Sequence, residues 1–229
     1  MITTGYPEYS ARKTEVVDVE SGETCADLDD FPVTNKWAVG ANLNGTPIVC
    51  GGLSSRTCYK FTNTGWQEFA SMNEKRQHAA GIMFKNKFHV FGGYDGLIKK
   101  TSEIISIDGG VEYGPELPEA VELHAITSIN STVSILSGGS TGYPNYKSPL
   151  TWYINHETNV FSSGPSLLEG RYWHGSATIV DKVTKEKIPM VTGGYGGNGR
   201  LDSTELLING EWQLGTRYYS VCEISQIPI

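Results

Sequence analysis

The sequence contains no apolar run that approaches the roughly 20 residues of a membrane-spanning helix. It contains no run of basic residues either, and its 18 Lys and Arg are outnumbered by 25 Asp and Glu, for a formal net charge of −7. Binding to a phosphate backbone depends on clustered Lys and Arg. We therefore expect no nucleic-acid partner and no membrane span.

The composition also predicts little helix. The 27 glycines and 10 prolines are spread between short runs rich in Val, Ile, Thr, Tyr and Phe, a pattern typical of many strands joined by tight turns. A chain of 229 residues is long enough for one large all-β domain with a sizeable core. We expect a single domain over residues 1–229.

A short apolar strand that ends in two glycines recurs along the chain. The glycine pairs are Gly51 and Gly52, Gly92 and Gly93, Gly138 and Gly139, and Gly193 and Gly194. A fifth copy begins at Met1 and has Thr4 before Gly5. The second glycines, at 5, 52, 93, 139 and 194, are 47, 41, 46 and 55 residues apart, which is the period of a propeller blade.

Each repeat is expected to hold four strands. The glycine-pair strand (b) is followed by strand c, by strand d with a bulky residue, and by strand a, which leads to the next pair. The bulky position of strand d holds Trp66, Trp212, Phe161, Val111 and Cys25. The expected a strands are Trp37–Leu43, His78–Phe84, His124–Ile129, His174–Val180 and Tyr218–Ile224.

The glycine pairs, the tryptophan of strand d and the approach Arg171-Tyr172-Trp173-His174 make the repeat resemble the kelch repeat. The resemblance, to kelch and galactose-oxidase-type β-propellers, covers nearly the whole chain and implies an all-β propeller of four-stranded blades. Departures are Thr4, Val111 and Cys25, and the lack of Arg before Trp37 and His124.

The number of blades stays open between two alternatives. Strand Tyr218–Ile224 is expected to complete the blade that contains Met1–Gly5, because the two ends together supply about one repeat. That pairing would close a five-bladed ring. The kelch resemblance instead implies six or seven blades, in which case the chain is a fragment of a larger propeller.

The glycine pairs are interpreted as structural, because residues without Cβ allow unusual dihedral angles and close backbone approach. A phosphate-binding glycine loop is excluded, since no helix pattern follows any pair. The glycine-dense stretch from Gly193 to Gly199 is expected to be a loop between strands.

No catalytic or metal-binding set emerges from the sequence. His78, His124 and His174 are expected at one repeat position in three blades, and therefore spread around the axis without meeting. His89 and His156 have no partner at ligand spacing. The acidic residues of the d–a loops are interpreted as a solvated surface; they are Asp27, Asp29, Asp30, Glu119 and Glu122. We expect no cofactor, and no residue matches a copper ligand of galactose oxidase.

Two features favour an extracellular location over a cytoplasmic one. Cys50 ends strand b and Cys58 begins strand c of the same blade, so their Cα atoms are expected within disulfide reach, whereas Cys25 and Cys222 do not obviously meet. Two sequons place possible N-glycans on Asn44 and Asn130, in a–b turns. Met1 begins directly on an expected strand, which is typical of a chain cut from a longer one, so the lack of a leader peptide says nothing about secretion.

The loops favour a non-catalytic binding module for another protein. The b–c loops are long and rich in Tyr, Gly, Asn and Arg, as in antibody paratopes, although exposed loops need turn formers in any case. Tyr94, Tyr143, Tyr195 and Arg200 are the candidate contacts, on the face formed by the b–c and d–a loops. The alternative is an enzyme or carbohydrate-binding propeller with its site at the central pocket.

Overall fold

The computed structural model describes residues 2–3, 12–18, 21–25, 28–143, 146–181 and 184–215. These residues form strands and turns, with no helix among them. The strands are β1 (Ile2–Thr3), β2 (Thr14–Val17), β3 (Thr24–Cys25), β4 (Val39–Leu43), β5 (Thr46–Cys50), β6 (Thr57–Thr62), β7 (Gly65–Ser71), β8 (Ala80–Phe84), β9 (Lys87–Phe91), β10 (Ser102–Ser106), β11 (Val111–Tyr113), β12 (Ala125–Ser128), β13 (Val133–Ser137), β14 (Thr151–Asn155), β15 (Val160–Ser163), β16 (Gly175–Val180), β17 (Lys187–Thr192), β18 (Tyr195–Gly196), β19 (Gly199–Arg200), β20 (Thr204–Ile208) and β21 (Glu211–Leu214).

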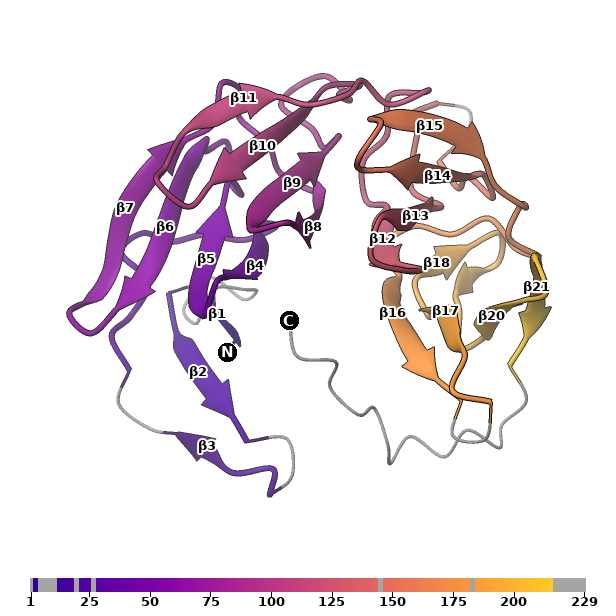
Figure 1. The fold of residues 1–229 in the computed structure, drawn as a ribbon, viewed down its shortest axis with the longest axis horizontal. Coiled ribbons are helices and arrows are strands. Elements are labelled where there is room, and N and C mark those ends of the chain that lie inside the picture. Colours follow the sequence, from indigo (N-terminus) through magenta and orange to yellow (C-terminus); the bar gives the residue numbers. More distant parts are fainter. Residues whose placement is uncertain are drawn as a thin grey trace.

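Apart from the two-stranded hairpin β18-β19, the described strands form five antiparallel sheets, which we call blades 1 to 5. Blade 1 is the three-stranded sheet β1-β2-β3, and blades 2, 3 and 4 are β4-β5-β6-β7, β8-β9-β10-β11 and β12-β13-β14-β15. Blade 5 is β16-β17-β20-β21. The blades follow one another in an arc, with β4, β8, β12 and β16 innermost and in contact in turn (Figure 1). The chain is thus an all-β propeller of about five blades, as its repeat predicts.

The core lies between the blades. One cluster joins β5 of blade 2 to β9 and β10 of blade 3, with Ile48, Cys50, Phe88, Val90 and Ile105 all buried. A second cluster joins blade 3 to blade 4. Blades 3 and 4 therefore bury side chains on both faces of their sheets, which explains why β9 and β13 are almost continuously apolar or buried.

The glycine pairs lie where neighbouring blades meet. All eight paired glycines have a positive φ, from 60° to 97°. A Cβ on Gly51 would clash with the carbonyl oxygen of Arg76, in the loop that enters the next blade. That same carbonyl accepts a hydrogen bond from the backbone N–H of Gly52, at 2.7 Å. The pair therefore lets two blades approach to backbone contact.

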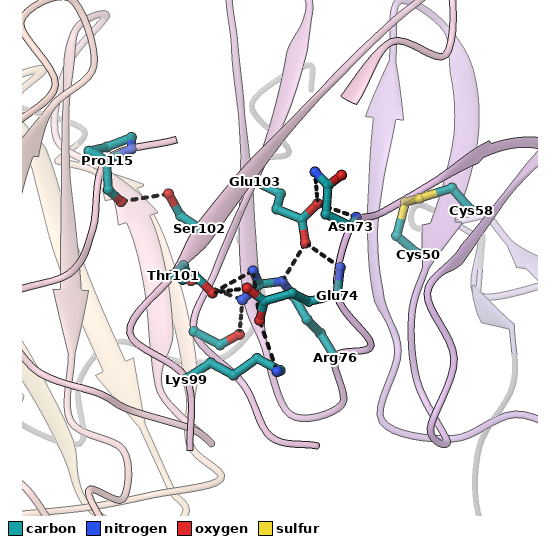
Figure 2. Close-up of polar contacts among 11 residues, drawn as sticks. Cys50, Cys58, Asn73, Glu74, Arg76, Lys99, Thr101, Ser102, Glu103 and Pro115 are labelled. Carbon is teal, nitrogen blue, oxygen red and sulfur yellow. Dashed lines mark hydrogen bonds and ion pairs between the residues drawn. A yellow bond between two sulfur atoms is a disulfide. The ribbon is translucent and has the colours of Figure 1, made fainter. Parts of the chain in front are cut away.

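A fully buried ion pair supports the same junction (Figure 2). Arg76 Nε lies 3.1 Å from Glu103 Oε1 in β10, and both side chains are completely buried. The guanidinium also donates to the carbonyl oxygens of Gly92 and Thr101. Blade 5 repeats this arrangement with Arg171 and Glu205, at 2.7 Å.

Two sequence predictions can be compared directly with these strands. Cys50 and Cys58 are joined by a disulfide between β5 and β6, as predicted (Figure 2). The stretch from Gly193 to Gly199 is not a simple loop, since Tyr195–Gly196 and Gly199–Arg200 form the hairpin β18-β19. The expected strand Tyr218–Ile224, and with it the closure of the ring, lies outside the described residues, as does Cys222.

Candidate functional site: an aromatic hollow at the axis

Four residues with a left-handed backbone stand at the entrance to the innermost strands. Trp37, His78, Leu123 and Trp173 have φ values of 63°, 58°, 59° and 55°. Each lies two residues before β4, β8, β12 or β16. Residues other than glycine rarely adopt this conformation, and it concentrates at functional or tightly constrained positions.

Hydrogen bonds between these four residues link the blades at the axis. The backbone N–H of His78 donates to the carbonyl of Trp37 at 3.1 Å, that of Leu123 to His78 at 2.9 Å, and that of Trp173 to Leu123 at 3.1 Å. Blades 2 to 5 are therefore joined around the axis by one continuous chain of backbone hydrogen bonds.

The four residues line an open hollow of about 250 Å³ together with the residue that follows each of them, Ala38, Ala79, His124 and His174. This arrangement corrects the prediction for the histidines. His124 and His174 are equivalent, but His78 lies one position earlier, at the place of Leu123 and Trp173. The three histidines also do not lie apart, because positions so close to the axis meet in one hollow.

Two tryptophans are unusually exposed at this hollow. Trp37 is 40% exposed and Trp173 is 52% exposed, whereas Trp66 and Trp212 are buried in their blades. The ring of His78 lies 4.7 Å from the ring of Trp37 and 6.3 Å from that of Trp173, edge to face in both cases. These three rings form a row, and they come from the loops that enter blades 2, 3 and 5.

An acid–base pair lies beside this row. His78 Nδ1 lies 2.8 Å from Glu122 Oε2, and the two side chains are 13% and 15% exposed. A carboxylate can only accept, so Nδ1 donates in this hydrogen bond. Nε2 is buried and has no hydrogen-bond partner among the described residues. Glu122, predicted to belong to a solvated acidic surface, is instead mostly buried.

The other two histidines, His124 and His174, also line the hollow. Burial lowers the pKa of His124 to about 3, and the nearby His174 lowers it as well. Burial and the charge of Arg171 lower the pKa of His174 to about 4, although a hydrogen bond with Ser137 acts to raise it. Both rings are therefore neutral at pH 7.

The predicted contact residues are only partly gathered at this hollow. Tyr195 lies 5.7 Å from Trp173, ring centre to ring centre, and Arg200 Nε donates to the Tyr195 hydroxyl at 3.0 Å. Tyr94 instead bridges Gln77 and Ile98 through its backbone. Tyr143 is 87% exposed and has Tyr146 as its aromatic neighbour, at 6.2 Å.

The sequence prediction missed Trp37 and Trp173 as site residues. The sequence could have indicated both, because Trp173 lies in the segment Arg171-Tyr172-Trp173-His174 and Trp37 begins an expected strand. An alignment of the repeats on their histidines places His78 opposite His174, and so does not reveal that His78 is equivalent to Trp173. Aligning them on Arg76 and Arg171 places His78 and Trp173 together.

The remaining titratable groups give no further candidate. His89 and His156 lie with ring centres 5.2 Å apart between blades 3 and 4, and burial lowers the pKa of each to about 4. In the part of the chain that the structure describes, no group of three or more His, Cys, Asp or Glu could hold a metal ion. No described helix is long and apolar enough to cross a membrane. Asp27 lies outside the described residues.

Comparison with solved structures supports the architecture. The fold is similar to that of YjhT, with a TM-score of 0.68 and 16% sequence identity, over 84% of this chain and 68% of the YjhT chain. No protein-family model and no curated protein matches the sequence. At this identity the likeness concerns the fold alone.

Proposed function

We propose that this protein is a kelch-type, non-catalytic binding module that recognises another protein through the face formed by its b–c and d–a loops. The observation that carries the proposal is the exposure of Trp37 and Trp173 around the axis on that face. Tryptophan, tyrosine and arginine are the residues that most often dominate binding energy at protein interfaces.

The loops around the hollow extend the same kind of surface. Tyr195 and Arg200 continue it beyond Trp173, and the ring of Tyr172 stacks on that of Tyr195 with centres 5.6 Å apart. Tyr143 and Leu97 project from the b–c loops of blades 4 and 3, and are 87% and 79% exposed. Rigid aromatic side chains supply contact area at a low cost in conformational entropy.

The opposite face offers less for a partner. Its turns are short, such as the β8–β9 turn, and exposed ion pairs such as Lys85 with Glu157 contribute little to affinity. The sequons Asn44 and Asn130 are exposed in the β4–β5 and β12–β13 turns, so glycans there would leave the loop face free. The disulfide Cys50–Cys58 supports an extracellular location, which we retain as part of the proposal.

A pull-down followed by alanine substitution tests this function. Changes at Tyr94, Tyr143, Tyr195 and Arg200 are expected to weaken the captured partner's binding without lowering the melting temperature. Changes at Lys85 and Lys87, on the opposite face, serve as the matched control and should do neither. If only the lysine variants lost binding, the interface would lie on the opposite face and the proposal would be wrong.

One observation favours the alternative of an enzyme or carbohydrate-binding site. The hollow gathers three histidines, of which His124 and His174 have lowered pKa values and His78 is paired with Glu122. Burial explains the two lowered values without any catalytic role. A panel of methyl glycosides tests this alternative, because saturable binding of one of them would favour it over protein recognition.

A further inference from the structure

We propose that the hollow at the axis takes the side chain of one arginine of a partner protein, an inference that rests on the proposed function. At about 250 Å³ the hollow is smaller than the roughly 300–1,000 Å³ of sites for drug-sized molecules. Its size instead suits a single side chain that anchors a larger interface.

The exposed rings provide the surfaces on which a guanidinium stacks. Arginine is planar and stacks on aromatic faces more readily than lysine does. The protein's own cations already lie on two rings of this surface. Lys36 Nζ is 4.4 Å from the centre of the Trp37 ring, and the Arg200 guanidinium carbon is 5.9 Å from that of Tyr195. These contacts show that cations gather on the aromatic rings at this end of the propeller.

The carboxylate of Glu122 lies beside the hollow, against His78 of its lining, and can accept hydrogen bonds from a cation there. The Glu122 carboxylate receives one side-chain hydrogen bond among the described residues, from His78 Nδ1, and is only 15% exposed. His78 Nε2 is buried and has no hydrogen-bond partner among the described residues. A buried carboxylate with unfilled lone pairs is costly, and a guanidinium carries five N–H donors and no acceptor. A tyrosine hydroxyl, with a single donor, would leave Glu122 mostly unmatched.

Charge favours the same occupant. The chain carries a formal net charge of −7, which attracts a basic segment over a distance. Lys36 acts against this attraction locally, because its ammonium occupies the Trp37 ring that a guanidinium would use. Arginine affinity should therefore rise when Lys36 loses its charge and fall when Glu122 does. A purely structural role of either residue would not produce these opposite effects.

The experiment compares the binding of two peptides of nearly identical shape to the full chain. They are N-acetyl-Gly-Arg-Gly-amide and its neutral citrulline analogue. Binding is followed by NMR through the indole N–H signals of Trp37 and Trp173. The arginine peptide is expected to bind at least about tenfold more tightly. Glu122→Gln and Trp173→Ala should each weaken it about tenfold, and Lys36→Gln should strengthen it several-fold. Val160→Ala, on the exposed outer strand β15, should change nothing.

Equal binding of the two peptides, or no binding of either at millimolar concentration, would overturn the proposal. So would a tyrosine peptide or a methyl glycoside that binds more tightly than the arginine peptide. If Glu122→Gln fails to fold, Trp173→Ala still tests the proposal, because the Trp173 side chain is half exposed and its removal should leave the fold intact. If the arginine peptide fails while alanine changes at Tyr143 and Tyr195 still weaken the captured partner, the arginine site is wrong and the proposed function stands.

Discussion

His78 Nδ1 lies 2.8 Å from Glu122 Oε2, and the two residues belong to the loops that enter blades 3 and 4. The same His78 receives a backbone hydrogen bond from Leu123 and gives one to Trp37. One residue therefore joins three blades at the axis and also faces the hollow. The surface that we propose for binding is thus built on residues that also link the blades to one another.

The blade junctions make a prediction about glycine. Gly92 and Gly96 both have a positive φ, of 60° and 80°, but a Cβ on Gly92 would clash with the carbonyl oxygen of Val121, while one on Gly96 would meet nothing within 4 Å. Gly96→Ala should cost about 1–2 kcal/mol of unfolding free energy, from backbone strain alone. Gly92→Ala should cost at least about 2 kcal/mol more, because the blades must also separate. Urea denaturation measures both, and equal costs would show that the junction does not depend on close approach.

The buried ion pair predicts an asymmetric pattern of stability. Arg76→Met leaves Glu103 charged and buried without its partner, so the free energy of unfolding should fall by about 3–5 kcal/mol. Adding Glu103→Leu should recover a large part of this loss, since no charge is then buried. Lys85→Met, which breaks the exposed pair with Glu157, should cost less than about 1 kcal/mol. Failure of the double variant to improve on the single one would contradict this account.

The buried histidines predict a loss of stability in mild acid. The pKa of His124 is lowered to about 3 and that of His174 to about 4, while in the unfolded chain both are near 6.5. Between these values the unfolded state binds more protons, so stability is complete above about pH 6.5 and falls as the pH drops toward 4. Each of the two histidines contributes up to about 1.4 kcal/mol per pH unit in this window.

Melting temperatures between pH 7.5 and 4.5 test this dependence. The wild-type melting temperature should fall on acidification, and His124→Leu should fall less steeply because one titrating group is gone. A variant whose slope equals that of the wild type would show that His124 does not stay neutral in the folded protein.

The disulfide predicts both a chemical and a thermodynamic result. Non-reducing peptide mapping of secreted protein should recover Cys50 and Cys58 in one linked peptide pair. The double variant Cys50→Ala, Cys58→Ala should lose about 2–3 kcal/mol, as expected for a short closed loop, and should be insensitive to reductant. Both residues recovered as free thiols would remove the main support for an extracellular location.

Much of the fold follows from the sequence because the repeat is local. The glycine pairs, the strand alternation around them and the cysteines of strands b and c each act within about one blade, where spacing determines neighbours. The hollow is different, because it depends on which residue of each approach adopts a left-handed backbone. Trp37, His78, Leu123 and Trp173 share that conformation without sharing a side chain, so no pattern of residue types marks the position. The contact of His78 with Glu122, 44 residues apart, likewise needs the packed blades.

Partner affinity of Trp37→Ala and Trp173→Ala, measured by calorimetry beside Lys85→Ala, tests most directly whether the aromatic hollow is the centre of a binding surface. Both indoles are substantially exposed, so their removal should leave the melting temperature nearly unchanged. We predict that each tryptophan variant loses about 30-fold or more in affinity, the level of an interface hot spot, and that Lys85→Ala binds as the wild type does. Unchanged affinity in both tryptophan variants would contradict the account.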